Sequence, residues 1–272
     1  MGQKALALWI VILFLAMLLA EIIGGHHRRN EHSLKDRFYA LTGLIFQTLI
    51  TPPIVGVTVG FLLVHFAPGN ANHLGDTPFW VIFPLWFVAE EFGHYWLHRW
   101  AHEWRWLWKL HRTHHSAPKL NVTVIFRYNV FWTFLLPQTW FGAVAVYMGL
   151  IEVLAVSSLI TFIVNLMTHT AYRWDLAVRK LPGMNPVFVV LEKVITLPDT
   201  HHAHHGLGRS AHMKGNYAVT IFLFDVLLGT ARIPRAPQEK FGLAGRFDWK
   251  EELLWPVMRR RPTLTRASEK AQ

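Results

Sequence analysis

The chain has 272 residues, of which 52% are hydrophobic and only 16% are charged, and its formal net charge is +10. Soluble domains carry about a quarter charged residues, so the composition predicts an all-α integral membrane protein of one structural domain. The absence of cysteine excludes disulfides, thiolate zinc sites and iron–sulfur clusters held by this chain. The basic residues lie between or after apolar runs, as membrane topology expects, so the charge does not indicate a nucleic-acid partner.

The first half of the chain predicts three transmembrane segments. An apolar run over residues 5–25 is close to the ~20 residues that cross a bilayer, and without a clear cleavage site we expect it to be retained. The run over 38–66 contains two consecutive prolines, which predict either one kinked, tilted span or a partly re-entrant segment. After a loop over 67–78 without Lys or Arg, the run over 79–97 crosses back.

The second half predicts two more spans, over residues 130–150 and 151–167, joined almost without a loop as in a tight helical hairpin. The total is about four to five transmembrane helices. Dense basic segments all fall on one face of this arrangement. The positive-inside rule assigns that face to the cytoplasm, and we expect the membrane to be the bacterial inner membrane.

The most informative feature is the concentration of histidines where the apolar runs end. Histidines four positions apart share one helix face and can approach one metal ion. The eight candidates in these clusters are His98, His102, His111, His114, His115, His201, His204 and His205. Eight imidazoles are too many for one four-coordinate zinc and fit two metal ions. Imidazole suits zinc, copper, iron and nickel, so the ligand type alone leaves the metal open.

The histidines belong to a longer ordered pattern. EFGHYWLHRWAH (91–102) is followed by LWKLHRTHH (107–115), NLMTHT (165–170), TLPDTHHAHH (196–205), and finally GNY (215–217) and FDVLLGT (224–230). This combination resembles the fatty acid hydroxylase / sterol desaturase superfamily of membrane non-haem di-iron oxygenases. The resemblance covers residues from about 80 to 230. It divides the chain into N-terminal transmembrane helices (1–78), a fatty acid hydroxylase-like catalytic domain (79–232) and a basic cytoplasmic tail (233–272).

The resemblance implies a cytosol-facing di-iron site above a hydrophobic substrate chamber, where O2 is used to hydroxylate or desaturate a lipid C–H bond. Carried over by position, the eight histidines would be ligands, with His169 as a further one. The residues expected to support these ligands or to join them are Glu91, His94, Asn165, His212 and Asp225. This sequence departs from the family pattern at three of its positions, since Asp is common where Glu91 stands, Tyr where His94 stands, and Trp where Phe224 stands.

The implied cofactors are two iron ions, with zinc able to replace them in purified material. The implied partners are a membrane lipid such as a sterol or fatty acyl chain, O2 and a separate electron donor, which would be a reductase, cytochrome or ferredoxin. No glycine-rich nucleotide-binding turn is found in the sequence, so the electrons must come from another protein. A histidine-rich metal transporter or metal-binding protein is the alternative. It is less favoured because the clusters begin where the apolar runs stop, outside the bilayer midplane.

Overall fold

The computed structural model describes residues 3–27, 33–244 and 247–259. This part of the chain is mostly helical, in agreement with the predicted fold class. The α-helices are α1 (Gln3–Ile23), α2 (Leu34–Ile45), α3 (Thr51–Phe66), α4 (Phe79–Glu103), α5 (Arg105–His115), α6 (Pro137–Met148), α7 (Ile151–His169), α8 (Trp174–Arg179), α9 (Met184–Val194), α10 (Pro198–His205), α11 (Leu223–Leu227) and α12 (Trp249–Leu254). Two short strands, β1 (Gly206–Leu207) and β2 (Lys240–Phe241), pair antiparallel.

Two helices in the described part are long and apolar enough to cross a membrane. The first is continuous over Leu34–Phe66 and comprises α2, a π-helical turn η1 (Phe46–Ile50) and α3. The second is α7. Pro52 and Pro53 follow directly on the π-helical turn, an irregularity of the kind that accompanies the missing N–H groups of prolines inside a continuous helix. The run over 38–66 therefore lies in one helix that contains a π-helical turn, and the chain does not fold back within it.

The predicted span over 130–150 is wrong in its first third. The helix in this region, α6, begins only at Pro137, and residues 132–134 form a separate 3-10 turn, η4. The reason is that Asn129 caps this segment: its Oδ1 accepts the N–H of Phe131, while its amide donates to the carbonyl of Trp255. The predicted hairpin between α6 and α7 is confirmed, with Gly149 in the left-handed conformation between the two helices.

The predicted span over 79–97 forms most of α4, which continues to Glu103 as one 25-residue helix. Glu90 and Glu91 are buried within it. Their carboxyl groups reduce the hydropathy of the helix, and α4 is not among the two candidate spans of the described chain. α1 contributes a shorter apolar stretch, Leu8–Ile23.

Much of the predicted tail over 233–272 packs on the body of the protein. β2 pairs with β1 directly after α10, and α12 lies against α5. The buried carboxylate of Glu252 accepts hydrogen bonds from Arg112 Nε at 2.7 Å and from Ser116 Oγ at 3.2 Å. β2 and α12 therefore belong to the folded body, held in part by two partly buried polar side chains that lie on α5 and directly after it, far away in the sequence. Residues 260–272 of that prediction lie outside the described residues.

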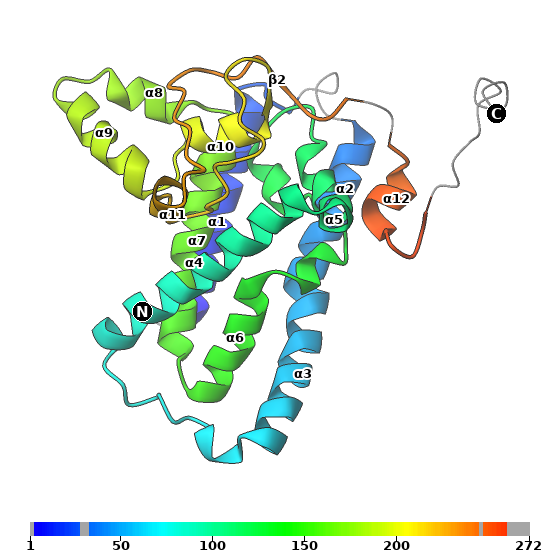
Figure 1. Ribbon diagram of the computed structural model, residues 1–272, viewed down its shortest axis with the longest axis vertical. Coiled ribbons are helices and arrows are strands. Elements are labelled where there is room, and N and C mark those ends of the chain that lie inside the picture. Colours follow the sequence, from blue (N-terminus) through cyan, green and yellow to red (C-terminus); the bar gives the residue numbers. More distant parts are fainter. Residues whose placement is uncertain (1–2, 28–32, 245–246, 260–272) are drawn as a thin grey trace.

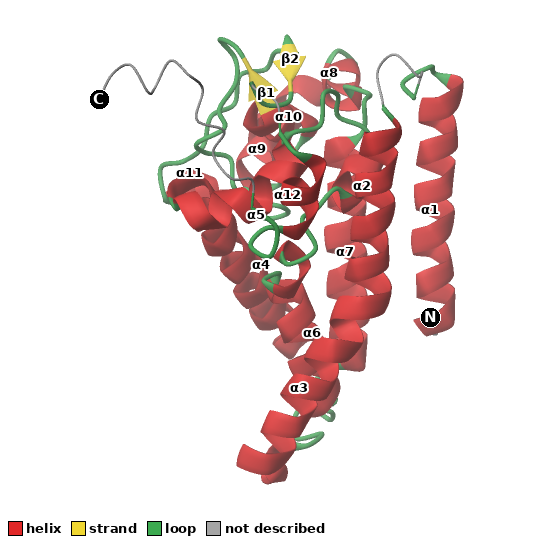
Figure 2. Ribbon diagram, turned by 90° about the vertical axis from the view of Figure 1, so that its right-hand side faces the viewer, coloured by secondary structure: helices red, strands yellow, loops and turns green. Residues whose placement is uncertain are grey.

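The helices diverge from one crowded end of the molecule. Figure 1 shows α3 and α6 extending toward the lower end, while α5, α8 and α10 gather at the upper end. Figure 2 shows both strands at that upper end too. The helices that carry the clustered histidines, α4, α5, α7 and α10, therefore meet at the end of the bundle away from the long apolar part of α3.

Candidate metal centre

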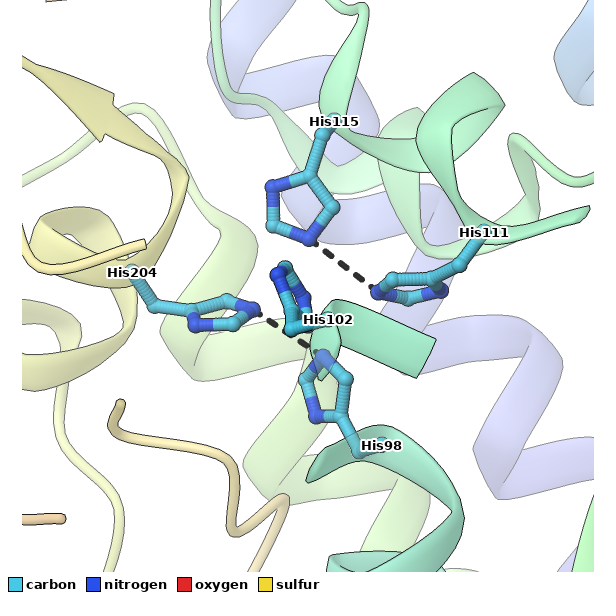
Figure 3. Close-up of side chains that lie close together, drawn as sticks. All are labelled: His98, His102, His111, His115 and His204. Atoms are coloured by element: carbon cyan, nitrogen blue, oxygen red, sulfur yellow. Dashed lines mark hydrogen bonds between the residues drawn. The ribbon is translucent and has the colours of Figure 1, made fainter. Parts of the chain in front are cut away.

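The structure brings nine of the predicted histidines together in two groups whose ligand atoms lie within 4.8 Å of one another in each group. The first group contains His98, His102, His111, His115 and His204; the second contains His114, His169, His201 and His205. Figure 3 shows the rings of the first group converging on one point. Each group combines side chains from α5 and α10 with side chains from α4 or α7, so segments distant in sequence complete each site.

The turn between α4 and α5 explains how one stretch of chain supplies five of these histidines. Trp104 is the single residue between the helices, and its extended backbone (φ −101°, ψ 120°) turns the chain into a new direction. His102 and His111 consequently face each other across the turn, with ring centroids 5.1 Å apart. Residues four apart on one helix, such as His111 and His115, then add to the same group.

Two backbone carbonyls fix the orientation of key imidazoles in the first group. The Nδ1 atom of His98 lies 2.6 Å from the carbonyl oxygen of Tyr217, and the Nδ1 atom of His204 lies 2.7 Å from that of Gly215. A carbonyl oxygen only accepts, so each Nδ1 must carry the proton and donate it. In the neutral ring the lone pair is then on Nε2, which points into the group.

The two Nε2 atoms of His98 and His204 are only 3.0 Å apart. Burial lowers the pKa of His204 to about 3, so this ring is neutral near neutral pH. Two neutral rings that already donate through Nδ1 present lone pairs to each other, and they cannot form a hydrogen bond. A cation between the two Nε2 atoms would remove the repulsion of their lone pairs. The two rings are therefore placed so that they could bind one metal ion.

The spacing of the nitrogens fits a bound transition metal. Imidazole nitrogens bind at about 2.1 Å, so two ligands at right angles are about 3.0 Å apart and two tetrahedral ligands about 3.4 Å. The Nε2 atoms of His111 and His115 are 3.1 Å apart. In the second group the Nε2 atom of His169 lies 3.0 Å from that of His201 and 3.3 Å from that of His114. These distances are those of neighbouring ligands of one ion.

Unsatisfied nitrogens support the same interpretation. The Nε2 atoms of His102 and His205 are buried and have no hydrogen-bond partner in the structure. Burial also lowers the pKa of His115, His201 and His205 well below the usual value. Unprotonated buried nitrogens without partners are costly unless a metal ion occupies them. Both groups contain imidazoles alone and no carboxylate.

Glu91 and Asn165, two of the residues expected to support the ligands, act in different ways, Glu91 through its carboxylate and Asn165 through its backbone carbonyl. The carboxylate of Glu91 accepts Thr161 Oγ1 at 3.0 Å and the N–H of Thr220 at 2.9 Å, so its observed bonds tie α4 to α7 and to the segment before α11. Among the residues that the structure describes, no histidine is hydrogen-bonded to Glu91, so the expected orientation of an imidazole by this carboxylate is not observed. Asn165 supports His169 through its backbone carbonyl, which accepts the Nδ1 proton at 3.0 Å.

His94 and His212 lie next to the first group without belonging to it. The Nδ1 atom of His94 accepts from the amide of Gln138 at 2.6 Å, and its ring centroid is 6.1 Å from that of His98. His212 donates to the carbonyl of Thr230 at 3.2 Å. Neither is within the sets of converging ligand atoms, so the two stand as neighbours of the site.

Asp225 supports the site from a distance. Its two oxygens accept the N–H groups of Tyr217 and Ala218, both at 2.8 Å, and its Oδ1 accepts Thr230 Oγ1 at 2.6 Å. The carbonyl of Tyr217 in turn accepts from His98. The carboxylate is buried and holds the loop that orients a candidate ligand.

The sequence reasoning missed Glu21, which is fully buried in α1. Its carboxylate accepts the N–H of Ala171 at 2.8 Å, Thr170 Oγ1 at 3.0 Å and the N–H of Val122 at 3.1 Å. It therefore fixes the chain directly after His169. A single carboxylate inside an otherwise apolar run was the signal in the sequence, because such a group is expensive in a membrane helix unless it is bound.

Comparison with known proteins identifies the family. The family model for fatty acid hydroxylases matches residues 83–230, more than half of the chain. The chain belongs to the fatty acid hydroxylase family. It is 25% identical to alkylglycerol monooxygenase of Xenopus tropicalis over 240 residues, which are 86% of this chain and 48% of that protein. The human alkylglycerol monooxygenase is 30% identical over 149 residues, 53% of this chain and 29% of that protein.

The zebrafish (Danio rerio) alkylglycerol monooxygenase is 27% identical over 248 residues, 89% of this chain and 52% of that protein. The chain thus spans about half the length of these relatives at most. No solved structure matches it. The family resemblance predicted from the sequence is confirmed. All nine histidines of the two groups lie within the matched region.

Proposed function

We propose that this protein is an O2-dependent di-iron oxygenase that hydroxylates a C–H bond of a membrane lipid. The observation that supports this proposal most strongly is the pair of all-histidine groups. Within them, the Nε2 atoms of His98 and His204 point toward each other. Membership of the fatty acid hydroxylase family supports the same activity. The metal-transporter alternative is not favoured, because the relatives in the comparison are monooxygenases.

The balanced reaction is R–H + O2 + two electrons + two protons giving R–OH + H2O. Two iron ions would be held by the first group and by the second group, and when bound they supply the two-electron redox capacity that zinc lacks. The protein's own contribution is orientation. The carbonyls of Tyr217 and Gly215 hold Nε2 of His98 and His204 toward the ion, and that of Asn165 does the same for His169.

The electrons would come from a separate reductase, cytochrome or ferredoxin. We further propose that the metal centre faces the cytoplasm, which the distribution of basic residues supports. A reporter fused after residue 272 would then be cytoplasmic, and a reporter signal from the opposite side would contradict this orientation. Because the relatives are alkylglycerol monooxygenases, an alkylglycerol is the first lipid to test as substrate.

The deciding experiment measures metal and turnover on the same preparation. Purified protein should contain about two iron ions per chain. With a reductant and O2 it should add one oxygen atom to the lipid, detected by mass spectrometry, and His98→Ala should lose the product together with about one of the two iron ions. Full turnover by protein shown to be free of iron would refute the proposal. A product lacking two hydrogens, with no oxygen added, would assign desaturation in place of hydroxylation.

A further inference from the structure

A cavity of about 600 Å³ lies among α3, α6 and α7, in the part of the molecule away from the strands. Its wall on α3 is the stripe Pro52, Gly56 and Gly60, which recurs every four residues and so occupies one helix face. Gln47, on the π-helical turn before α3, lines the cavity on the same side. From Gln47 to Gly60 the lining of this helix is roughly 20 Å long, at 1.5 Å per residue. Such a length with glycine on one wall fits one extended hydrocarbon chain better than a broad polycyclic molecule.

One end of this cavity adjoins the metal centre. Gln138 lines the cavity and donates to His94 at 2.6 Å, and the ring of His94 is next to that of His98. Nearby, the first residue of α3, Thr51, is hydrogen-bonded to Thr133 at 2.7 Å, beside Trp132. The ring of Trp132 lies 4.6 Å from that of His111, a member of the first histidine group. The Gln47 and Gln138 end is thus the metal end.

Tyr147 lines the other end. Its hydroxyl group donates to the carbonyl of Ala67 at 2.6 Å and to that of Leu63 at 3.2 Å, which joins the end of α6 to the end of α3. Gly60 and Val146 line the cavity at this end. A chain that enters with its polar end toward Gln138 therefore directs its tail toward Tyr147.

The lining of the cavity carries no charged side chain. Its polar members are the amides of Gln47 and Gln138 and the hydroxyl groups of Thr139, Tyr147 and Ser158. The Oε1 atom of Gln47 is buried without a partner and is available to accept a hydrogen bond. An ionised carboxylate or phosphate would be buried here without a counter-charge, which is strongly unfavourable. Hydroxyl, ether or ester oxygens would instead be matched by the amides.

We propose that this cavity binds one uncharged single-chain lipid, with its oxygen-bearing end at Gln47 and Gln138 and its tail against Gly56 and Gly60. The proposal rests on the proposed lipid oxygenase function. It adds a substrate class and a structural basis for selecting substrates by the length of their hydrocarbon chain. A Cβ atom added at Gly56 or Gly60 would meet nothing within 4 Å, so larger side chains at these positions enter the open cavity. Both glycines lie outside the region matched by the family model.

Replacement of either glycine by leucine should shorten the chain that the cavity accepts. Leucine also favours helix over glycine, so neither variant should unfold α3. The two positions are four residues apart, about 6 Å along the helix, and each methylene of an extended chain advances roughly 1.3 Å. The longest chain accepted by Gly56→Leu should therefore be shorter by roughly four to five carbons than that accepted by Gly60→Leu. The matched control is Val57→Leu, on the same helix at a position that is 74% exposed.

Binding is measured without turnover, using a radiolabelled alkylglycerol series of increasing chain length and purified full-length protein in detergent. In Gly60→Leu the longest chains should lose about tenfold in affinity while short chains bind as in the unchanged protein. Gln138→Leu should weaken all chain lengths and leave the metal content unchanged. An alkylglycerol with a photoreactive group at its terminal carbon should label the segment around Tyr147.

The possible outcomes separate this proposal from the proposed function. If the alkylglycerols bind with the expected length profile but are not oxidised, the cavity assignment stands and the oxygenase proposal fails. If the protein oxidises lipid while both leucine variants keep the original length profile, the cavity assignment is overturned. Tighter binding of ionised palmitate or of cholesterol than of the alkylglycerol would also overturn it.

Discussion

The Nδ1 proton of His98 is donated to the carbonyl oxygen of Tyr217 over 2.6 Å, and this carbonyl belongs to a loop whose N–H groups are bound by Asp225. A candidate ligand on α4 is thus oriented by a carboxylate on α11 that does not touch it. The interaction fixes which nitrogen of His98 is free to bind a metal ion.

Asp225→Ala should weaken metal binding at the first histidine group. Removal of the carboxylate leaves the N–H groups of Tyr217 and Ala218 without acceptors, and the loop that orients His98 loses its anchor. Loss of such supporting contacts typically lowers metal affinity about 10- to 100-fold. The affinity is measured by competition with a chelator, with Asp76→Ala at an exposed position as control. Unchanged affinity in Asp225→Ala would show that the loop holds its shape without the carboxylate.

The two groups should lose metal independently. His204→Ala should remove the ion of the first group and His201→Ala that of the second, so each variant should retain about one ion per chain. His202→Ala is the matched control. His202 is buried on the same helix, but its Nε2 donates to the carbonyl of Thr170 and it belongs to neither group. Metal analysis of the three proteins decides the point, and loss of both ions in His202→Ala would contradict it.

The metal-free protein should lose stability on acidification. Burial depresses the pKa of His202 and His204 from 6.5 to about 3. The unfolded chain therefore binds more protons than the folded one between these values, and stability falls as the pH drops below 6.5. The slope is up to about 1.4 kcal/mol per pH unit for each such histidine.

This dependence is measured by unfolding of the metal-free protein at several pH values. His202→Gln should reduce the slope, because it removes one group that titrates only in the unfolded state. A stability that stays constant or rises as the pH falls from about 6.5 would contradict the assignment of neutral buried histidines.

Glu21→Ala should destabilise the contact of α1 with the end of α7. Besides its contact with His27, Glu21 accepts from donors on Val122, Thr170 and Ala171, and these three would lose their acceptor in a largely buried place. Each unsatisfied group costs about 1–3 kcal/mol, so the total loss should be about 3 kcal/mol or more. Hydrogen exchange at Ala171 and thermal unfolding measure it, with the exposed Glu152→Ala as control. Equal stability of the two variants would contradict this role.

The nine histidines expected as ligands are also those that the structure gathers in two groups, and part of this gathering was predictable because their spacing follows the helix period. His98 and His102, or His111 and His115, share a helix face whatever the tertiary structure, and a motif shared with a known family placed His169 beside them. The contacts that orient these rings could not be predicted. They are made by backbone carbonyls such as that of Tyr217, and a carbonyl has no residue-type signature.

The boundaries of the elements were harder to predict than their existence. Hydropathy alone extended a span across residues 130–136, where Asn129 and α12 impose turns. For the same reason α12 could not be predicted from hydropathy, since its packing depends on Arg112 in a distant part of the sequence. Glu21 was overlooked because a long apolar run was taken as a unit, although one carboxylate within it anchors the helix.

Both histidine groups draw ligands from α5 and from α10, which are far apart along the chain. If each group holds one ion as proposed, neither ion could be fully coordinated until α10 has been synthesised and has folded toward α5. Metal loading would then be a late event in assembly, and the bound ions would act as two crosslinks that close the long loop between these helices. A cell short of the metal would accumulate a chain that is inserted but incompletely closed, and this form would be the preferred target of membrane proteases.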